Sequence, residues 1–276
     1  MEHPILDRGW RIVLVVTAAE SVEDVQRSLR ELPGSSLTRD VAILAPDLPA
    51  LRDELALADW PVDYALPATL EEGSYWSRVL SACAPLDGQT IFLRAGVRTP
   101  EHFDARLAAL GQSSPDAAAI VPLCAADALV SVFSGPVDTP ALDVDDLDQW
   151  VNEYSASRLY EFPALPLGCA LLQGACWSVD LASCADDGAL FARLRQQGAS
   201  LLLTDQVYVD DSGPVRPVER AWLPRARRDA WGPHSPLTGL RHAITELAGR
   251  AEKPPRRVPC LPVQLHVGHS WGGGLG

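Results

Sequence analysis

The stretch Thr90-Ile-Phe-Leu-Arg-Ala-Gly-Val-Arg-Thr-Pro-Glu-His-Phe103 decides the fold that this sequence predicts. Its apolar part, Ile91-Phe92-Leu93, predicts a short buried strand that ends at Arg94-Ala95-Gly96. Thr99 then suits a helix N-cap, and Pro100 suits the first helical position. Proteins that alternate strands and helices bind ligands where a strand ends in polar residues before a helix. The tip of this strand is therefore the first candidate site.

Apolar runs typical of buried strands alternate with helical patterns on both sides of this stretch. Ser21 and Asp24 form a capping-box pattern, which predicts the start of the first helix. Further strands are expected at 11–16, 41–45, 62–66, 117–122, 130–133 and 199–204. Further helices are expected at about 48–55, 73–83, 145–154 and 186–194. This alternation predicts an α/β fold with a mostly parallel central sheet flanked by helices.

The composition is that of a globular protein with a sizeable core. The chain has 276 residues, of which 47% are hydrophobic. No window approaches the ~20 apolar residues that a membrane span needs, and the first residues lack a signal-peptide pattern, so we expect a cytoplasmic protein. The six cysteines show no metal-finger spacing, and most lie in apolar runs, as buried free thiols do.

The formal net charge of −13 is unevenly distributed. Residues 216–257 hold ten of the 23 basic residues, whereas most acidic residues lie in the body of the chain. Because the acidic body would repel phosphates at long range, we expect no nucleic acid partner. The basic region suits either a solvated Pro-rich linker or peripheral contact with the anionic inner membrane.

Composition also divides the chain at about residue 212. We expect one domain over 1–212, and a Pro/Arg-rich extension over 213–260 with a single helix at 237–251. Residues 261–276 combine an apolar strand pattern with a glycine-rich loop. That segment suits the start of a second domain, with more of the same protein after Gly276; a flexible glycine tail is the alternative.

Three segments, taken in order, resemble the inverting glycosyltransferases of the GT-A fold, the large family-2-type group. The turn after 11–16 resembles the segment that receives the nucleotide, and Thr90–Phe103 resembles the strand that ends in Asp-x-Asp before a proline and a helix. Asp186-Asp187-x-x-Leu-x-x-Arg193 resembles the Glu-Asp-x-x-Leu-x-x-Arg helix of the family. The resemblance covers roughly 11–211, and 261–276 is similar to the opening of a GT-B-type domain.

The resemblance implies a GT-A-like, Rossmann-like sheet and a reaction. A hexosyl group would pass from a nucleotide sugar to a glycan or lipid-linked glycan acceptor with inversion, as in polysaccharide biosynthesis. Asp187 takes the position of the catalytic base, which removes the proton from the acceptor hydroxyl. The residues expected to contact the nucleotide sugar are Thr17, Glu20, Asp47, Arg94, Gly96 and Arg98. The residues expected at the acceptor site are Gly174, Trp177 and Asp186.

The sequence departs from the family at the metal site. The family usually holds Mg²⁺ or Mn²⁺ on Asp-x-Asp, and the ion neutralises the leaving diphosphate. Here that position is Arg94-Ala95-Gly96, so we expect no metal ligands and no metal cofactor. A guanidinium cannot bind a metal ion, but it can form a forked pair with a diphosphate.

Two functions therefore remain open. One is a metal-independent or atypical glycosyltransferase; the other is a catalytically inactive GT-A-like domain that binds a glycan, a nucleotide or another domain. The same residues also have structural explanations: Asp186 and Asp187 suit a helix N-terminus, Arg94 suits a surface ion pair, and Thr17 and Glu20 suit a turn. Dehydrogenase and P-loop motifs are absent after the first strand, which excludes those two classes.

Overall fold

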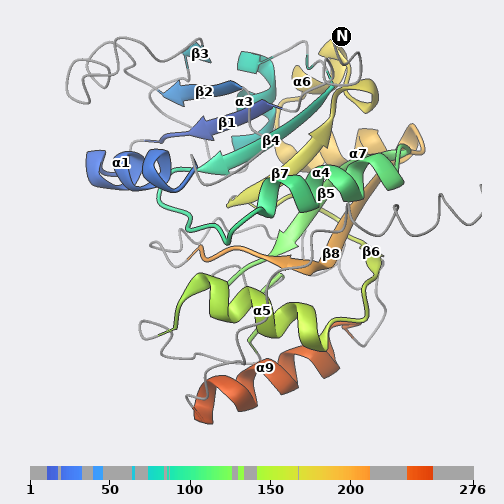
Figure 1. Cartoon of the computed structure of the whole chain (residues 1–276). Coiled ribbons are helices and arrows are strands. Elements are labelled where there is room, and N and C mark those ends of the chain that lie inside the picture. Colours follow the sequence, from blue (N-terminus) through green and yellow to red (C-terminus); the bar gives the residue numbers. More distant parts are fainter. Residues whose placement is uncertain are drawn as a thin grey trace, which may run out of the picture.

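A computed structural model describes residues 11–17, 20–32, 40–45, 64–65, 74–83, 86, 88–125, 130–133, 142–166, 168–211 and 235–250 of the chain. These residues form an α/β fold in which one eight-stranded sheet lies between helices (Figure 1). The predicted fold class is therefore confirmed.

The sheet is mostly parallel, with a reversed strand near its middle. Its strands are β1 Arg11–Val15, β2 Asp40–Ala45, β3 Tyr64–Ala65, β4 Gln89–Arg94, β5 Ala117–Leu123, β6 Leu159–Glu161, β7 Cys169–Gln173 and β8 Ser200–Tyr208. Their order across the sheet is β3-β2-β1-β4-β7-β5-β8-β6. Only β7 and β6 run antiparallel to their neighbours among these strands. All the other strands end at the same edge, which we call the carboxyl edge.

The central strands are buried along most of their length. Every residue of β5 and β7 is buried, and in β1 only the first residue, Arg11, is exposed. Continuous apolar runs of this kind are typical of strands that are covered on both faces. Chemistry is thereby confined to the ends of the strands.

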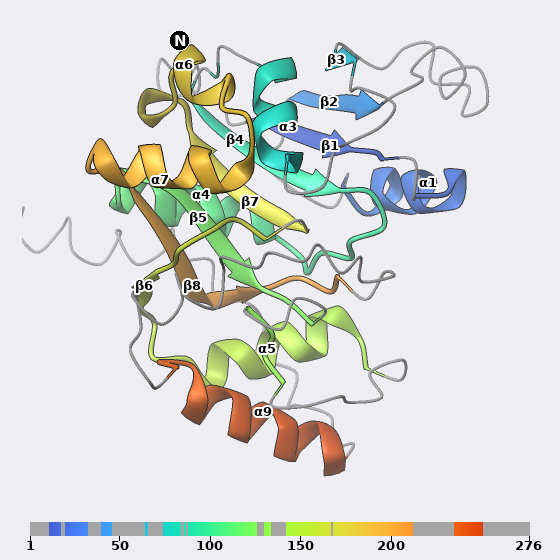
Figure 2. The same ribbon diagram turned by 180° about the vertical axis from the view of Figure 1, so that it is seen from behind.

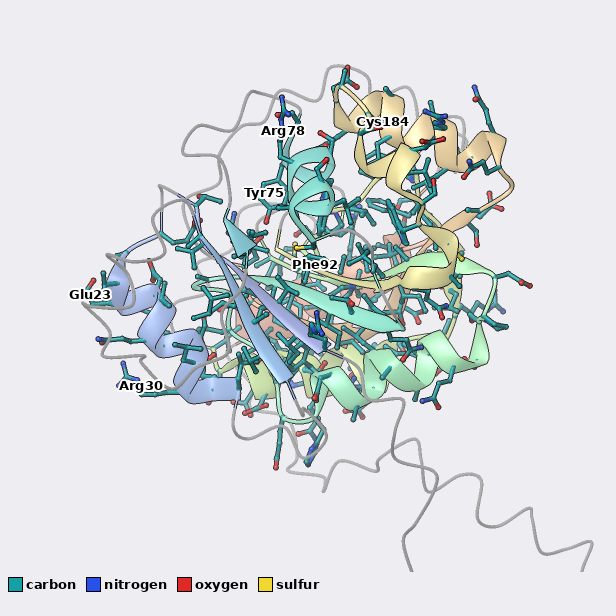
Figure 3. All side chains as sticks on the ribbon, turned by 90° about the horizontal axis from the view of Figure 1, so that it is seen from above. Glu23, Arg30, Tyr75, Arg78, Phe92 and Cys184 are labelled. Carbon is teal, nitrogen blue, oxygen red and sulfur yellow. The ribbon has the colours of Figure 1, made fainter. Side chains whose placement is uncertain are left out.

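Helices cover both faces of the sheet. They are α1 Val22–Glu31, α3 Tyr75–Cys83, α4 Phe103–Ser113, α5 Val144–Tyr154, α6 Val179–Ala182, α7 Asp187–Gln196 and α9 Thr238–Arg250. The helix α4 covers one face, and α3 and α7 cover the other (Figure 1 and Figure 2). Figure 3 shows α3, with Tyr75 and Arg78, lying above Phe92 of β4. The rings of Trp76 and Phe92 meet edge to face there, with centroids 5.8 Å apart.

The helix α1 begins with the predicted capping box. The Ser21 hydroxyl accepts a hydrogen bond from the Asp24 N–H at 3.2 Å, and the Asp24 carboxylate accepts one from the Ser21 N–H at 3.0 Å. Its core face is buried, whereas Glu23 and Arg30 point away from the sheet (Figure 3). The local pattern was sufficient here because both partners lie within one turn.

A further layer lies beside β8 in Figure 1, where α5 packs along the strand and α9 packs on α5. The helical spacing of four apolar residues, Leu147, Trp150, Val151 and Tyr154, predicts one core face for α5. The first three are buried, but Tyr154 is 47% exposed, so the prediction is wrong for that residue. Ile244 of α9 is fully buried in the common core. The helix expected in the extension therefore packs against the body of the protein.

The helix after β4 starts later than predicted. Thr99 does not cap it; α4 begins at Phe103, and its N-cap is His102 in the left-handed conformation with φ 60°. Arg98 instead forms an antiparallel bridge with Asp210, and a turn closed by a hydrogen bond from Phe103 N–H to the Pro100 carbonyl at 3.3 Å precedes the helix. A pairing partner so distant in sequence leaves no local signal.

Other expectations have mixed outcomes. Residues 130–133 contribute one bridge, Cys124 to Ser131, instead of the expected strand. The five described cysteines are free, and burial raises the pKa of Cys83 to about 12. None of the described helices is both long and apolar enough to span a membrane. The helix expected at about 48–55 lies outside the described residues.

Candidate active site

An arginine held between two carboxylates stands at the carboxyl edge. Arg94, the last residue of β4, donates a hydrogen bond from Nη2 to Asp211 Oδ1. Its Nε lies 3.8 Å from Glu20 Oε1. The side chains of these three residues, here called the Arg94 triad, are at most 11% exposed. Arg94 is therefore paired within the chain, and the pairing is buried instead of lying on the surface.

Glu20 connects this triad to the turn after β1. Its Oε2 accepts hydrogen bonds from the backbone N–H and the hydroxyl of Thr17, each at 2.6 Å. The Glu20 N–H donates back to the Thr17 carbonyl at 3.3 Å. Thr17 and Glu20 thus form the turn that leads into α1, and Glu20 also supplies a negative charge to Arg94.

Asp211 is held by close packing on the other side of the guanidinium. The Arg94 N–H donates to the Gly168 carbonyl at 2.9 Å. A Cβ placed on Gly168 would lie 2.6 Å from Asp211 Oδ2, closer than real Cβ atoms approach. Only glycine therefore fits at residue 168 while Asp211 stays against Arg94.

The loop after β4 is fastened on two sides. Gly96, with φ +88°, donates its N–H to the Ser28 hydroxyl of α1 at 2.9 Å. Arg98 lies 3.5 Å from Asp210 Oδ2 and 3.3 Å from Asp143 Oδ1. The positive charge of Arg98 is therefore also matched within the chain.

The two aspartates of the expected catalytic helix act at the N-termini of two different helices. Asp186 is the N-cap of α7, and its Oδ1 accepts a hydrogen bond from Ala189 N–H at 2.7 Å. Asp187 is only 3% exposed, and its Oδ1 accepts a hydrogen bond from Ser77 N–H at 2.9 Å. Asp187 thereby stabilises the N-terminus of α3, where a negative charge is favoured.

Tyr75, the first residue of α3, is influenced by the charges of the Arg94 triad and of Asp187. Burial raises the pKa of its hydroxyl; the positive charge of Arg94 opposes this, and the negative charges of Glu20, Asp211 and Asp187 add to it. The residues gathered at the carboxyl edge are therefore Thr17, Glu20, Arg94, Gly96, Arg98 and Asp187.

Two expected acceptor residues lie at the opposite edge of the sheet. Gly174 donates its N–H to the Gly88 carbonyl, before β4, at 2.7 Å, and Trp177 Nε1 donates to the Ala118 carbonyl at 2.8 Å. Because β7 is reversed, its end lies near the start of β4, about 17 Å from Arg94 at ~3.3 Å per residue. The structure does not bring Gly174 or Trp177 near Asp187. Asp47 lies outside the described residues.

Three residues of this edge were not predicted from the sequence: Tyr75, Asp210 and Asp211. The acidic pair follows β8 after one residue, Val209, so it is a second polar strand end. The expected strand stopped at residue 204, because Thr204-Asp205-Gln206 interrupts the apolar run, and the pair therefore belonged to no element. Extending the strand to Tyr208 would have placed both aspartates at the carboxyl edge.

The described residues include no group of three or more His, Cys, Asp or Glu side chains arranged to hold a metal ion. At the carboxyl edge a guanidinium lies between the carboxylates instead. The edge can therefore offer a fixed positive charge to an anion, and buried carboxylates that can accept a proton.

No family model and no curated protein matches this chain. Among solved structures it is similar to GalNAc-T7 with UDP, GalNAc and Mn²⁺, with a TM-score of 0.50 and 15% identity over 74% of this chain and 44% of that chain. This chain thus spans less than half of that protein. The mannosyltransferase PcManGT from Pyrobaculum calidifontis, in complex with GDP-Man and Mn²⁺, gives a TM-score of 0.47 and 14% identity over 99% of this chain and 83% of that chain. At such identities the first similarity shows a shared, GT-A-like fold.

Proposed function

We propose that this chain is a glycosyltransferase domain that transfers a sugar from a nucleotide sugar to a glycan acceptor with inversion, and that it does so without metal ligands at the end of β4. One observation carries the proposal: a buried guanidinium, Arg94, ends β4 at the carboxyl edge, and a buried carboxylate, Asp187, is hydrogen-bonded to the first turn of α3, whose Tyr75 is influenced by both charges. This is the edge where open α/β sheets bind nucleotides.

The two groups match the two demands of the reaction. Departure of a nucleoside diphosphate creates negative charge, which a positioned guanidinium stabilises through forked hydrogen bonds. Attack by the acceptor hydroxyl needs a carboxylate to take its proton. The hydrogen bond from Ser77 to Asp187 Oδ1 would fix the orientation of that carboxylate.

Calorimetry and a transfer assay test the proposal. UDP, GDP and dTDP sugars are titrated with and without EDTA, and transfer is measured for the wild type, Asp187→Asn and Asp186→Asn. We expect one nucleotide to bind regardless of EDTA, and Asp187→Asn to abolish transfer. Asp186→Asn tests the neighbouring acid separately, because asparagine retains helix capping and any loss of transfer then reflects the expected acceptor contact. Absence of nucleotide binding at millimolar concentration would refute the proposal.

A catalytically inactive binding domain is the second candidate, and the same contacts favour it. Arg94 already has two carboxylate partners, and Asp187 already caps α3. If the domain is inactive, Arg94→Ala and Asp187→Asn should lower the melting temperature, and the wild type should transfer no sugar. If the chain is a glycosyltransferase, Arg94→Ala should weaken the binding of a nucleoside diphosphate more than that of a nucleoside. Equal effects on both ligands would show that Arg94 does not contact the diphosphate.

A further inference from the structure

We propose that Glu20 is a displaceable internal anion: a diphosphate binds Arg94 by taking the place of Glu20, while Asp211 remains as the permanent partner. The inference rests on the proposed function, because it concerns the same guanidinium. It makes Glu20 the residue that sets the selectivity of the site for multiply charged phosphates.

The contacts of Asp211 are those of a fixed partner. It accepts a hydrogen bond from Arg94 Nη2, although the two residues are 117 positions apart in the chain. Its side chain is 7% exposed and packs directly against Gly168. Moving Asp211 would disturb the junction between β4, β7 and the end of β8.

Glu20, in contrast, makes a longer ion pair with Arg94 and hydrogen bonds to a residue close in sequence. Its nearest approach to Arg94 is 3.8 Å, beyond hydrogen-bond range, and the buried Arg94 Nε has no hydrogen-bond partner in the part of the chain that the structure describes. Among the described residues, the Glu20 side chain is otherwise hydrogen-bonded to Thr17 alone, three residues away. It can therefore rotate away by breaking only local hydrogen bonds and one long ion pair.

The unpaired Nε explains why a ligand would gain from this exchange. A buried N–H without an acceptor is unfavourable, and an oxygen at hydrogen-bond distance from Nε would satisfy it. To replace the Glu20 carboxylate, the ligand must bring more negative charge than the single charge it displaces. A pyrophosphate or nucleoside diphosphate meets this condition, whereas an uncharged nucleoside does not.

Calorimetry with inorganic pyrophosphate, UDP and uridine tests the exchange. The variants are Glu20→Gln, Glu20→Asp and Asp211→Asn, with Asp180→Asn as control because the Asp180 side chain is 80% exposed. Glu20→Gln removes the competing charge at nearly unchanged size, so pyrophosphate and UDP should bind about tenfold more tightly and uridine unchanged. Asp211→Asn removes an equal charge but leaves Glu20 beside Nε, so it should not reproduce the tenfold gain, and neither should Glu20→Asp, which keeps the charge.

A gain of affinity is not what a merely structural role of Glu20 would produce. Equal or weaker pyrophosphate binding by Glu20→Gln overturns the inference, as does a lack of pyrophosphate binding by every protein. If Glu20→Gln gains pyrophosphate affinity but no protein binds or transfers a nucleotide sugar, the exchange stands and the proposed function fails. If the wild type transfers a sugar and Glu20→Gln has no effect on pyrophosphate binding, the proposed function stands and the exchange fails.

Discussion

At the scale of single residues, two tyrosines of the β8 region differ in how their hydroxyl groups are satisfied. The hydroxyl of Tyr208, at the end of β8, is buried and has no hydrogen-bond partner among the described residues. The hydroxyl of Tyr160, in β6, donates to Asp205 Oδ2 at 3.1 Å. An unsatisfied buried hydroxyl costs about 1–3 kcal/mol, whereas a satisfied one contributes about 1 kcal/mol.

We predict opposite effects from removing these hydroxyls. Tyr208→Phe should leave the free energy of unfolding unchanged or raise it by about 1 kcal/mol, and Tyr160→Phe should lower it by about 1 kcal/mol. Urea denaturation followed by circular dichroism measures both. A Tyr208→Phe variant less stable than Tyr160→Phe would contradict the contacts described.

A buried ion pair joins α4, α5 and β8. Arg106 pairs with Asp148, and Asp148 also accepts a hydrogen bond from Tyr208 N–H at 2.8 Å. Burial raises the pKa of Asp148, and the charge of Arg106 opposes this rise. Removing the arginine would therefore raise this pKa further and leave a buried charge unpaired.

Arg106→Met should lower the free energy of unfolding by about 3 kcal/mol at pH 7. A carboxyl whose folded pKa exceeds its unfolded value, near 3.8, favours folding most at low pH, and this contribution falls as pH rises through the folded pKa. The variant should thus lose more stability than the wild type between pH 4 and 7. Urea titrations at each pH test this, and Arg106→Met/Asp148→Asn should remove the extra pH dependence.

At the scale of elements, α1 supports the loop after β4 through its first turns. A Cβ on Gly96 would lie 3.3 Å from Asp24, and Gly96 is hydrogen-bonded to Ser28. The backbone N–H of Ser21, followed by its hydroxyl, lowers the pKa of the Asp24 carboxyl, with Arg27 adding to this effect. The capping box therefore stabilises α1 most when Asp24 is ionised.

Asp24→Asn should lower the free energy of unfolding by about 0.5–1 kcal/mol at pH 7. Because the folded pKa lies below the unfolded one, the wild type has this advantage above about pH 4 and loses it as pH falls through the folded pKa. Glu23→Gln, on the outer side of the same turn (Figure 3), is the control and should change little. Thermal melts at pH 7 and pH 3 compare the three proteins; an equal loss in both variants would argue against the capping box.

Local patterns predicted the elements whose partners are near in sequence and failed where the partners are distant. The Ser21–Asp24 box was found because its hydrogen bonds span three residues. The extension of β8 was missed because Asp205 reads as a break, although Ala156 N–H, Arg158 N–H and the hydroxyl of Tyr160 satisfy its carboxylate. Those donors lie more than 40 residues earlier in the chain.

The candidate site likewise contains residues that the sequence places correctly and residues whose position depends on distant contacts. The residues Thr17, Glu20 and Arg94 could be placed at one edge, because parallel strands end together. The direction of β7 could not be read from its sequence, and this direction moved Gly174 and Trp177 to the far edge. That Asp211 pairs with Arg94 is a tertiary contact with no local signal.

At the scale of the whole molecule, α9 belongs to the same core as the sheet. Ile244 is fully buried, and Arg241 donates a hydrogen bond from Nε to the Ser131 carbonyl at 2.7 Å. Elements that share one core unfold together in a domain of ordinary size. The helix should therefore unfold cooperatively with the rest of the described structure.

Ile244→Ala should lower the free energy of unfolding by about 2–4 kcal/mol while retaining a single transition. His242→Ala, at an exposed position of the same helix, should change it by less than about 0.5 kcal/mol. Coincident urea transitions by circular dichroism and tryptophan fluorescence check the cooperativity. Two separate transitions, or an unaffected Ile244→Ala, would show that α9 is an independent unit.

The reversed strand β7 has a consequence for synthesis on the ribosome. It pairs with β4 on one side and β5 on the other, so both remain without their neighbour until residue 173 has been translated. At about 5–20 residues per second, β4 waits roughly 4–16 s after its own last residue. Nascent chains stalled before residue 169 should therefore expose one unpaired edge of β4 and both edges of β5 to chaperones, because β8 is also still to be made. Chains stalled well beyond residue 211 should release the chaperones.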